Sequence, residues 1–464
     1  MKRALIFFAL LGGCSMEPKY VRPAPAIPAT LPAGDTVTAP LDRRAIFRDP
    51  RLLALIERAI INNQNLRATL ANVEVARGQY RVQRAAQLPA VDLGATAGLR
   101  KGTSSTQLAN GSGSSSGSSV RQNYSVDLGI NAFELDLFGR VRSLSNAALD
   151  EYLASDAGAR AVRVTLVGDV AEAWFTYASD RSLLAIADDT RKAAEQSARL
   201  TEARRKGGIA PRSDLDQALT IQKTAEADYA RQTAQVAQDR NALVLLLGGP
   251  VADAELAPTI DNALASITSP PVDISSEVLL RRPDVISAEY RLRAANARIG
   301  AARAAFFPRI SLTGLLGFAS NALGALFDGG SFNWSASGNL SQPIFDWGAN
   351  KGNLTVARAG ADAAVANYQN AIQTAFRETA DALARRATLG DEEKAGRDLV
   401  AAAADNAYLA DARYKGGVDT FLSSLDAQRS LYSARRSLVT TELARAANVA
   451  NLYRALGGDA ELPR

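Results

Sequence analysis

The hexapeptide Arg204-Arg205-Lys206-Gly207-Gly208-Ile209 returns about 209 residues later as Arg413-Tyr414-Lys415-Gly416-Gly417-Val418. At the same offset Leu247-Gly248-Gly249 returns as Leu456-Gly457-Gly458, and Phe138-Gly139 is echoed by Trp347-Gly348. Leu88-Pro89 is echoed by Phe307-Pro308 at a longer offset, because a Gly/Ser-rich run (102–119) lengthens the first copy. Such self-similarity is the signature of internal repetition. We therefore expect a duplicated chain, with repeats at 49–250 and 276–464 and a linker at 251–275.

Both repeats share one predicted order of elements: a helix, two strands joined by a loop, a long helix, a turn and a return helix. In the first repeat, residues 50–86 are rich in Ala, Arg and Gln and predict a helix that Pro89 ends. A long helix is expected over 139–205, and the return helix over 211–247. One apolar face of the long helix is expected to consist of Leu166, Val170, Ala173, Trp174 and Tyr177. At 1.5 Å per residue the long helix measures roughly 100 Å, which suits either a soluble coiled-coil rod or the wall of a tube.

Strands are predicted at about 88–100, 122–137, 308–320 and 332–345. In the segment 332–341, FNWSASGNLS, every second residue is polar and all but one of the others are apolar. Such alternation suits a half-buried soluble sheet or a membrane barrel. We favour the barrel, because segments of about ten residues match the length of a tilted strand that crosses a bilayer. The polar face consists of small residues, as expected for a wet lumen.

A membrane sheet has to close, because open edges leave backbone groups unpaired in hydrocarbon. Four strands are too few, since known barrels begin at about eight. Two copies would give eight strands with a filled interior, whereas three copies would give twelve strands and a lumen. The predicted fold class is therefore an α+β membrane protein that closes its barrel by oligomerisation.

The N-terminus has the features of a targeting signal. Lys2 and Arg3 precede an apolar run (4–11) that is too short to span a bilayer but fits a secretory signal, which we place at 1–13. The sequence Leu11-Gly12-Gly13-Cys14 resembles the bacterial lipobox, whose cysteine carries lipid; the alternative is an ordinary signal peptide with an incidental cysteine. Residues 14–48 are expected to form a Pro-rich tether. Ser15, rather than Asp, follows the cysteine and points to the outer membrane.

Composition argues against an enzyme. The chain has no His, which removes the commonest general base and metal ligand, and its single Cys excludes internal disulfides and thiolate metal sites. We find no phosphate-binding glycine loop and no dinucleotide fingerprint. The net charge of +5 is spread along the chain, so no nucleic-acid partner is expected. Chance pairs among the 48 acidic residues are interpreted as solvated helix surface. We predict no catalytic residue, no metal and no cofactor apart from the lipid on Cys14.

Together these features resemble the outer membrane factor family of TolC-like exit channels, and in particular its NodT-type lipoprotein branch. The resemblance rests on the order of three segments along a duplicated chain: CSMEPKYVRP at 14–23, LRRPDV at 280–285, and ARYKGGV with SLDAQ at 412–428. It implies a homotrimer with a 12-stranded outer-membrane barrel, four strands per chain, continued by a helical tunnel through the periplasm. It also implies a periplasmic adaptor (a membrane fusion protein) and an inner-membrane pump, with the RND class as first choice.

The function implied by the resemblance is passive export of drugs or other small molecules through a tripartite pump. Two alternatives remain: a duct for type I protein secretion, and a structural lipoprotein that spans the periplasm without conducting.

Two groups of site residues follow. The expected periplasmic turns, which the resemblance makes adaptor-docking tips, contain Gly207, Gly208, Ile209, Gly416, Gly417 and Val418. Leu422 and Asp426 share a helix face at i, i+4 spacing, and Asp216 matches Asp426 in the first repeat. The resemblance places Leu422 and Asp426 at a closed constriction, with Arg429 among its ion pairs. A ring of three such carboxylates would favour cations. The alternative is that Asp426 pairs with a neighbouring Arg on a solvated helix face.

Overall fold

The structure is a computed structural model that describes residues 15–25, 27–28, 42–103, 118–268 and 276–459. The predicted signal (1–13), the lipidation site Cys14 and most of the Gly/Ser-rich run lie outside the described residues. The chain divides into two compact units. One unit consists of Met1–Pro23, Glu74–Ala154 and Glu289–Asn367, and the other of Ala24–Val73, Ser155–Ala288 and Tyr368–Arg464.

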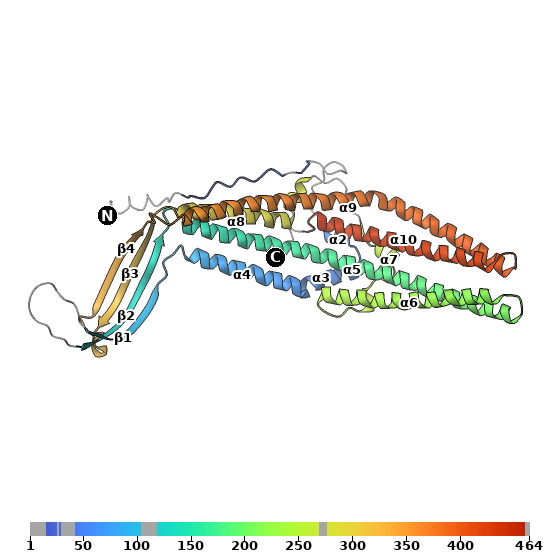
Figure 1. The fold of residues 1–464 in the computed structure, drawn as a ribbon, viewed down its shortest axis with the longest axis horizontal. Coiled ribbons are helices and arrows are strands. Elements are labelled where there is room, and N and C mark those ends of the chain that lie inside the picture. Colours follow the sequence, from blue (N-terminus) through green and yellow to red (C-terminus); the bar gives the residue numbers. More distant parts are fainter. Residues whose placement is uncertain (1–14, 26, 29–41, 104–117, 269–275, 460–464) are drawn as a thin grey trace, which may run out of the picture. The chain divides into compact units, whose positions relative to one another are not determined.

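The first unit contains a single antiparallel sheet in the order β1-β2-β3-β4 (Figure 1). The strands are β1 (Asp92–Thr103), β2 (Ser118–Leu135), β3 (Arg309–Ser320) and β4 (Phe332–Ser341). The β2–β3 pair joins the first repeat to the second, while β1 and β4 form the two edges. A bulge interrupts β2, where Ala132 has a φ of 49° and its N–H is donated to the Thr313 hydroxyl at 3.1 Å.

β1 and β2 differ from the expected bounds at both ends and β4 at its C-terminal end, and a proline explains two of these differences. β1 begins at Asp92 rather than near 88, because Pro89 lacks the N–H that a ladder bond needs. β4 ends at Ser341 rather than 345 for the same reason, since Pro343 follows. Every residue of β4 is exposed in the single chain, including Trp334 at 72% and Leu340 at 64%. An isolated chain therefore leaves the apolar face of this strand uncovered.

The helices repeat in the same order. The first repeat contains α3 (Pro50–Asn62), α4 (Gln64–Ala85), α5 (Arg140–Lys206) and α6 (Arg212–Leu247). The second repeat contains α8 (Pro283–Ala304), α9 (Ala349–Lys415) and α10 (Phe421–Ala455). Short elements complete the fold: α2 (Arg43–Ile46), α7 (Ile260–Leu264), η1 (Asp253–Glu255), η2 (Ser276–Arg281) and η3 (Leu323–Ala325). None of the helices in the described part of the chain has an apolar stretch long enough to cross a membrane.

The single helix expected over 50–86 is wrong in one respect, because it is broken at Asn63. This residue has an extended backbone (φ −61°, ψ 122°) and ends α3. Its side-chain oxygen accepts from the Leu66 N–H at 3.0 Å, and its amide nitrogen donates to the Leu246 carbonyl at 2.9 Å. Asn63 thus caps α4 while tying it to the end of α6, a role that helix composition does not reveal.

The core of the second unit forms around the predicted apolar face of α5. Val170 and Trp174 are fully buried, Leu166 and Tyr177 nearly so, and Ala173 packs against them half-buried. The Trp174 indole N–H is donated to the Glu255 carbonyl at 3.2 Å. The described part of the expected linker, residues 251–268, belongs to this core, because Leu256 and Ile260 are buried in it. This part is therefore packed structure rather than a simple connection.

Candidate gate and docking tips

The two expected turns have one geometry. After α5, the N–H groups of Gly207, Gly208 and Ile209 bond to the carbonyls of residues 203, 205 and 204 at 3.0, 3.0 and 2.9 Å. After α9, Gly416, Gly417 and Val418 repeat the pattern with residues 412, 414 and 413 at 2.9, 3.0 and 2.9 Å. These are helix C-caps that satisfy the last carbonyls of each long helix.

The second glycine of each turn has a left-handed backbone, with φ of +71° at Gly208 and +74° at Gly417. A Cβ at either position would meet nothing within 4 Å, so the glycine is needed for its conformation and not for space. Ile209 and Val418 follow and are 78% and 70% exposed. Each tip therefore ends in one uncovered apolar side chain on a fixed turn.

The two tips also contact each other. The Arg204 guanidinium lies over the Tyr414 ring at 4.5 Å and donates to the Lys415 carbonyl at 3.2 Å. The Tyr414 ring packs on Phe421 with centroids 5.3 Å apart. The hairpins α5–α6 and α9–α10 are thus linked beside their turns.

The candidate gate residues lie near these tips and are exposed in the single chain. Leu422 is 56% exposed on α10. Asp426 Oδ1 lies 3.9 Å from Arg429 Nη1, and Asp216 Oδ2 lies 3.6 Å from Arg212 Nε, with all four side chains mostly exposed. The alternative pairing with a neighbouring Arg is therefore present, but it is long and solvated, a kind of contact that contributes little.

The structure brings all four gate candidates to one cavity of about 1290 Å³ between α5, α6 and α10. Asp216 contributes from α6, and Leu422, Asp426 and Arg429 from α10. On the same walls the Tyr432 hydroxyl donates to Asp228 Oδ2 at 3.3 Å, which links α10 to α6. Asp189 and Asp228 add to the acidic lining. The arrangement can attract and hold cationic groups.

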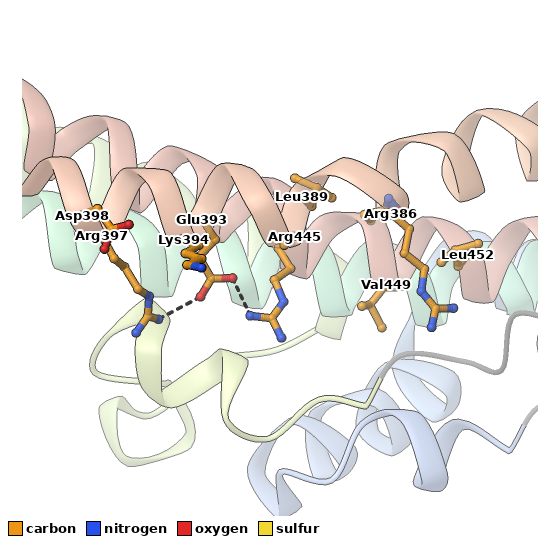
Figure 2. A pocket seen from close by; sticks show the side chains of 11 residues that line it. Arg386, Leu389, Glu393, Lys394, Arg397, Asp398, Arg445, Val449 and Leu452 are labelled. Atoms are coloured by element: carbon orange, nitrogen blue, oxygen red, sulfur yellow. Dashed lines mark hydrogen bonds and ion pairs between the residues drawn. The ribbon is translucent and has the colours of Figure 1, made fainter.

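A buried ion-pair cluster between α9 and α10 was missed by the sequence analysis (Figure 2). Glu393, which is 6% exposed, accepts from Arg397 at 2.9 Å and from Arg445 at 2.5 Å. Arg397 also donates to the nearly fully buried Glu442 at 3.3 Å. Burial, followed by the nearby Asp261 carboxylate, raises the pKa of Glu442 to about 7. Glu393, Arg397 and Arg445 line a cavity of about 570 Å³.

The first hairpin buries a different polar group, which was also missed. Asp239 on α6 is 8% exposed and lies within hydrogen-bonding reach of the Asp180 carboxyl on α5. Gln235 donates to Asp239 Oδ1 at 3.1 Å, and Gln232 donates to Asp180 Oδ1 at 3.0 Å. Burial, followed by the Asp180 carboxyl, raises the pKa of Asp239 to about 7. A proton shared by the two carboxyls would satisfy the buried Asp239 Oδ2, which has no donor among the described residues.

These polar groups have only a weak sequence signal. Each is one acidic residue inside a helix that already carries many solvated charges, and only the helix pairing decides which of them is buried.

A family model described as "Outer membrane efflux protein" matches residues 55–249 and 274–458. The chain belongs to the outer membrane efflux protein family. The solvent efflux pump outer membrane protein SrpC of Pseudomonas putida is 42% identical over 472 residues, covering 98% of each chain. The antibiotic efflux pump outer membrane protein ArpC of Pseudomonas putida is 41% identical over 459 residues, covering 97% of this chain and 93% of its own. The open-state MtrE outer membrane channel of Neisseria gonorrhoeae superposes with a TM-score of 0.84 at 37% identity, covering 96% of this chain and 99% of that one.

Family membership confirms several predictions. The chain is an outer-membrane efflux channel protein with the TolC-like combination of four strands and long helices. The family consists of channels and not catalysts, so the prediction that the chain is no enzyme is confirmed as well. The gate, the docking tips, the lipid and the number of copies stay predictions.

Proposed function

We propose that three copies of this chain form the passive exit duct of a tripartite efflux pump for small molecules, including organic solvents and antibiotics. The observation that carries the proposal is the four-stranded sheet, whose two edge strands, β1 and β4, have no neighbour on one side in a single chain. The large apolar side chains of these two strands are exposed as well. Such a sheet is stable in a membrane only when further copies close it. Twelve strands leave room for a lumen, which eight do not.

The cargo is inferred from the relatives. SrpC and ArpC are named for solvent and antibiotic efflux and align over nearly the whole chain. This support favours small molecules over the alternative of type I protein secretion. In such a pump a periplasmic adaptor would dock at the tips, where Ile209 and Val418 stand exposed on fixed turns. An RND-type inner-membrane transporter would drive the export.

Lipidation at Cys14 would add a second attachment to the membrane. A buried acyl chain contributes about 0.8 kcal/mol per methylene, but a closed barrel holds the protein in the membrane without it. We therefore expect Cys14→Ala to slow processing and assembly more than it reduces transport. Mass spectrometry of the mature N-terminus tests this: an unmodified Cys14 would refute the lipobox.

Complementation tests the function. A host that lacks its own exit channel, supplied with this chain, the cognate adaptor and the pump, should regain resistance to solvents and antibiotics. Purified protein should also conduct ions in planar bilayers, which separates a channel from a structural lipoprotein. Export of a polypeptide in place of drug resistance would favour the secretion alternative.

A face test addresses the barrel. Trp334→Asp and Leu340→Asp should block assembly, because a charge facing lipid near mid-bilayer costs up to a few kcal/mol. Ser335→Asp and Ser337→Asp, on the other face of the same strand, are the matched controls and should assemble. Equal tolerance of all four substitutions would rule out a lipid-facing side on β4.

A further inference from the structure

Three of the four junctions between strands and helices carry aromatic residues, and one pair of junctions is already packed within the chain. Phe138, between β2 and α5, stacks on Phe307, between α8 and β3, with ring centroids 4.6 Å apart and an interplanar angle of 19°. This contact accompanies the β2–β3 pairing, which joins the first repeat to the second. It is therefore a contact between the end of one repeat's strands and the start of the next repeat's strands.

The matching residues of the other two junctions have no such cover. Trp347, between β4 and α9, is 90% exposed, and Leu88, between α4 and β1, is 71% exposed. Next to Trp347, Ile344 and Phe345 are 91% and 73% exposed. Three large apolar side chains on one short connection form an uncovered patch that an isolated chain has no reason to keep.

The internal duplication predicts which residues should cover this patch. Trp347 matches Phe138, and Leu88 matches Phe307, in the alignment of the two repeats. Phe138 covers Phe307 where β2 meets β3, so Trp347 should cover Leu88 where a β4 edge meets a β1 edge. Within one chain β4 and β1 are opposite edges of the sheet, so that meeting requires a second copy.

The connection also presents Trp347 in a fixed way. Asp346 accepts from the N–H groups of Gly348 and Asn350, both at 2.9 Å, and so caps the start of α9. The capped turn gives Trp347 a φ of +53°, a conformation that a bulky residue rarely adopts. The Phe345 ring packs edge-on against the indole with centroids 4.6 Å apart. The indole is thus oriented before any partner arrives, which lowers the entropic cost of docking.

We propose that Ile344, Phe345 and Trp347 form an interaction surface for a second copy of this chain, packing on its Leu88–Val91 junction as Phe138 packs on Phe307. The inference rests on the proposed closed assembly. It specifies a contact between two copies at the connections between their strands and helices. Leu88 and Val91 offer the partner an apolar surface, since they are 71% and 60% exposed. Membrane lipid is the competing occupant.

Photo-cross-linking in the outer membrane tests the surface. With Trp347 replaced by p-benzoylphenylalanine in the full chain, irradiation should give species of twice and three times the chain mass on denaturing gels. Peptide mapping should find the cross-link at residues 88–91. The matched control replaces Phe138 in the same way; it should cross-link near Phe307 of the same chain without a gain in mass. Replacing Leu88 gives the reciprocal test, which should label the segment 344–347 of a second copy.

The outcomes separate the surface from the function. If native mass spectrometry counts three chains but position 347 labels only lipid, or labels a second chain elsewhere, the surface is wrong and the closed duct stands. If no multi-chain particle forms with either labelled variant or with the unmodified chain, both proposals fail. Inter-chain labelling between 347 and 88–91 supports the surface.

Discussion

The two periplasmic hairpins are alike at their ends and different in the middle. α5 and α9 each have 67 residues, and both end in the same glycine turn. Between the helices, however, the first hairpin buries Asp239 beside the half-buried Asp180, whereas the second buries Glu393 and Glu442, which pair with half-exposed arginines. The turn was retained in both copies because backbone geometry dictates it. The interior was free to diverge because several side-chain combinations can satisfy it.

One matched position shows the divergence directly. Asp239 in the first repeat corresponds to Asn448 in the second, and both are buried. Asn448 donates to the Ala382 carbonyl at 3.0 Å and stays neutral at any pH. A protonated Asp239 has nearly the same shape as Asn448 and is likewise uncharged. The matched site therefore favours a neutral side chain in both repeats, and Asp239 becomes neutral by binding a proton.

The largest expected effect is at the tips, where the hairpins are alike. Gly208→Trp and Gly417→Trp should each abolish efflux while leaving the assembled particle intact, because a bulky side chain would obstruct an adaptor at the turn. Drug susceptibility with a particle count measures both. Gly208→Ala and Gly417→Ala are the controls: each should cost only about 1–2 kcal/mol of left-handed backbone strain. Full resistance in both Trp variants would place the adaptor elsewhere.

The next effect is at the candidate gate, where the hairpins differ at the position four residues before each Asp. Leu422 precedes Asp426 by four residues, but Arg212 holds that place before Asp216. Asp426→Ala combined with Leu422→Ser should raise resting conductance severalfold and weaken block by multivalent cations, since it removes the apolar and acidic rings together. Asp216→Ala should do less, because it removes one acidic ring and leaves the apolar ring in place. Unchanged conductance, cation block and antibiotic sensitivity in the double variant would move the gate elsewhere in the tunnel.

A smaller effect separates the two interiors by stability. Arg445→Met leaves the buried Glu393 with one partner fewer and should cost roughly 1–3 kcal/mol. Arg385→Met, which breaks an exposed pair with Glu392 on the same helix, should cost 0–1 kcal/mol, a rough value for surface pairs. Asp239→Asn should cost almost nothing at neutral pH. Thermal unfolding in detergent ranks the three variants, and a cost for Asp239→Asn equal to that of Arg445→Met would contradict the neutral-site interpretation.

The smallest effect is on pH dependence. The pKa of Asp239 is raised from 3.8 to about 7 in the folded chain, so the folded protein holds a proton that the unfolded chain releases. Stability should therefore fall as pH rises from about 4 to about 7 and then level off. Asp239→Asn should flatten part of this fall, while Asp405→Asn, at an exposed position on α9, should leave it unchanged. The raised pKa of Glu442 acts with the same sign and contributes to the remaining slope.

The features that sequence could predict are those fixed locally or by periodicity. The glycine turns, the long helices and the alternation of β4 each depend on residues within a few positions. Pro89 and Pro343 limit the strands just as locally, although the expected bounds included both prolines. The break at Asn63, the Asp180–Asp239 pair and the Glu393 cluster could not be predicted in the same way. Each of these features depends on which residue of a distant helix lies opposite it. Other acidic residues on the same helices are solvated, so the residue type alone does not show which of them is buried.

The central claim is that the four-stranded sheet of each chain closes into a barrel only when several chains combine, and counting the chains tests it most directly. Native mass spectrometry of the particle extracted from outer membranes should give three copies, because three sheets of four strands are needed for a barrel with a lumen. A particle of one or two copies that still supports efflux would contradict the account.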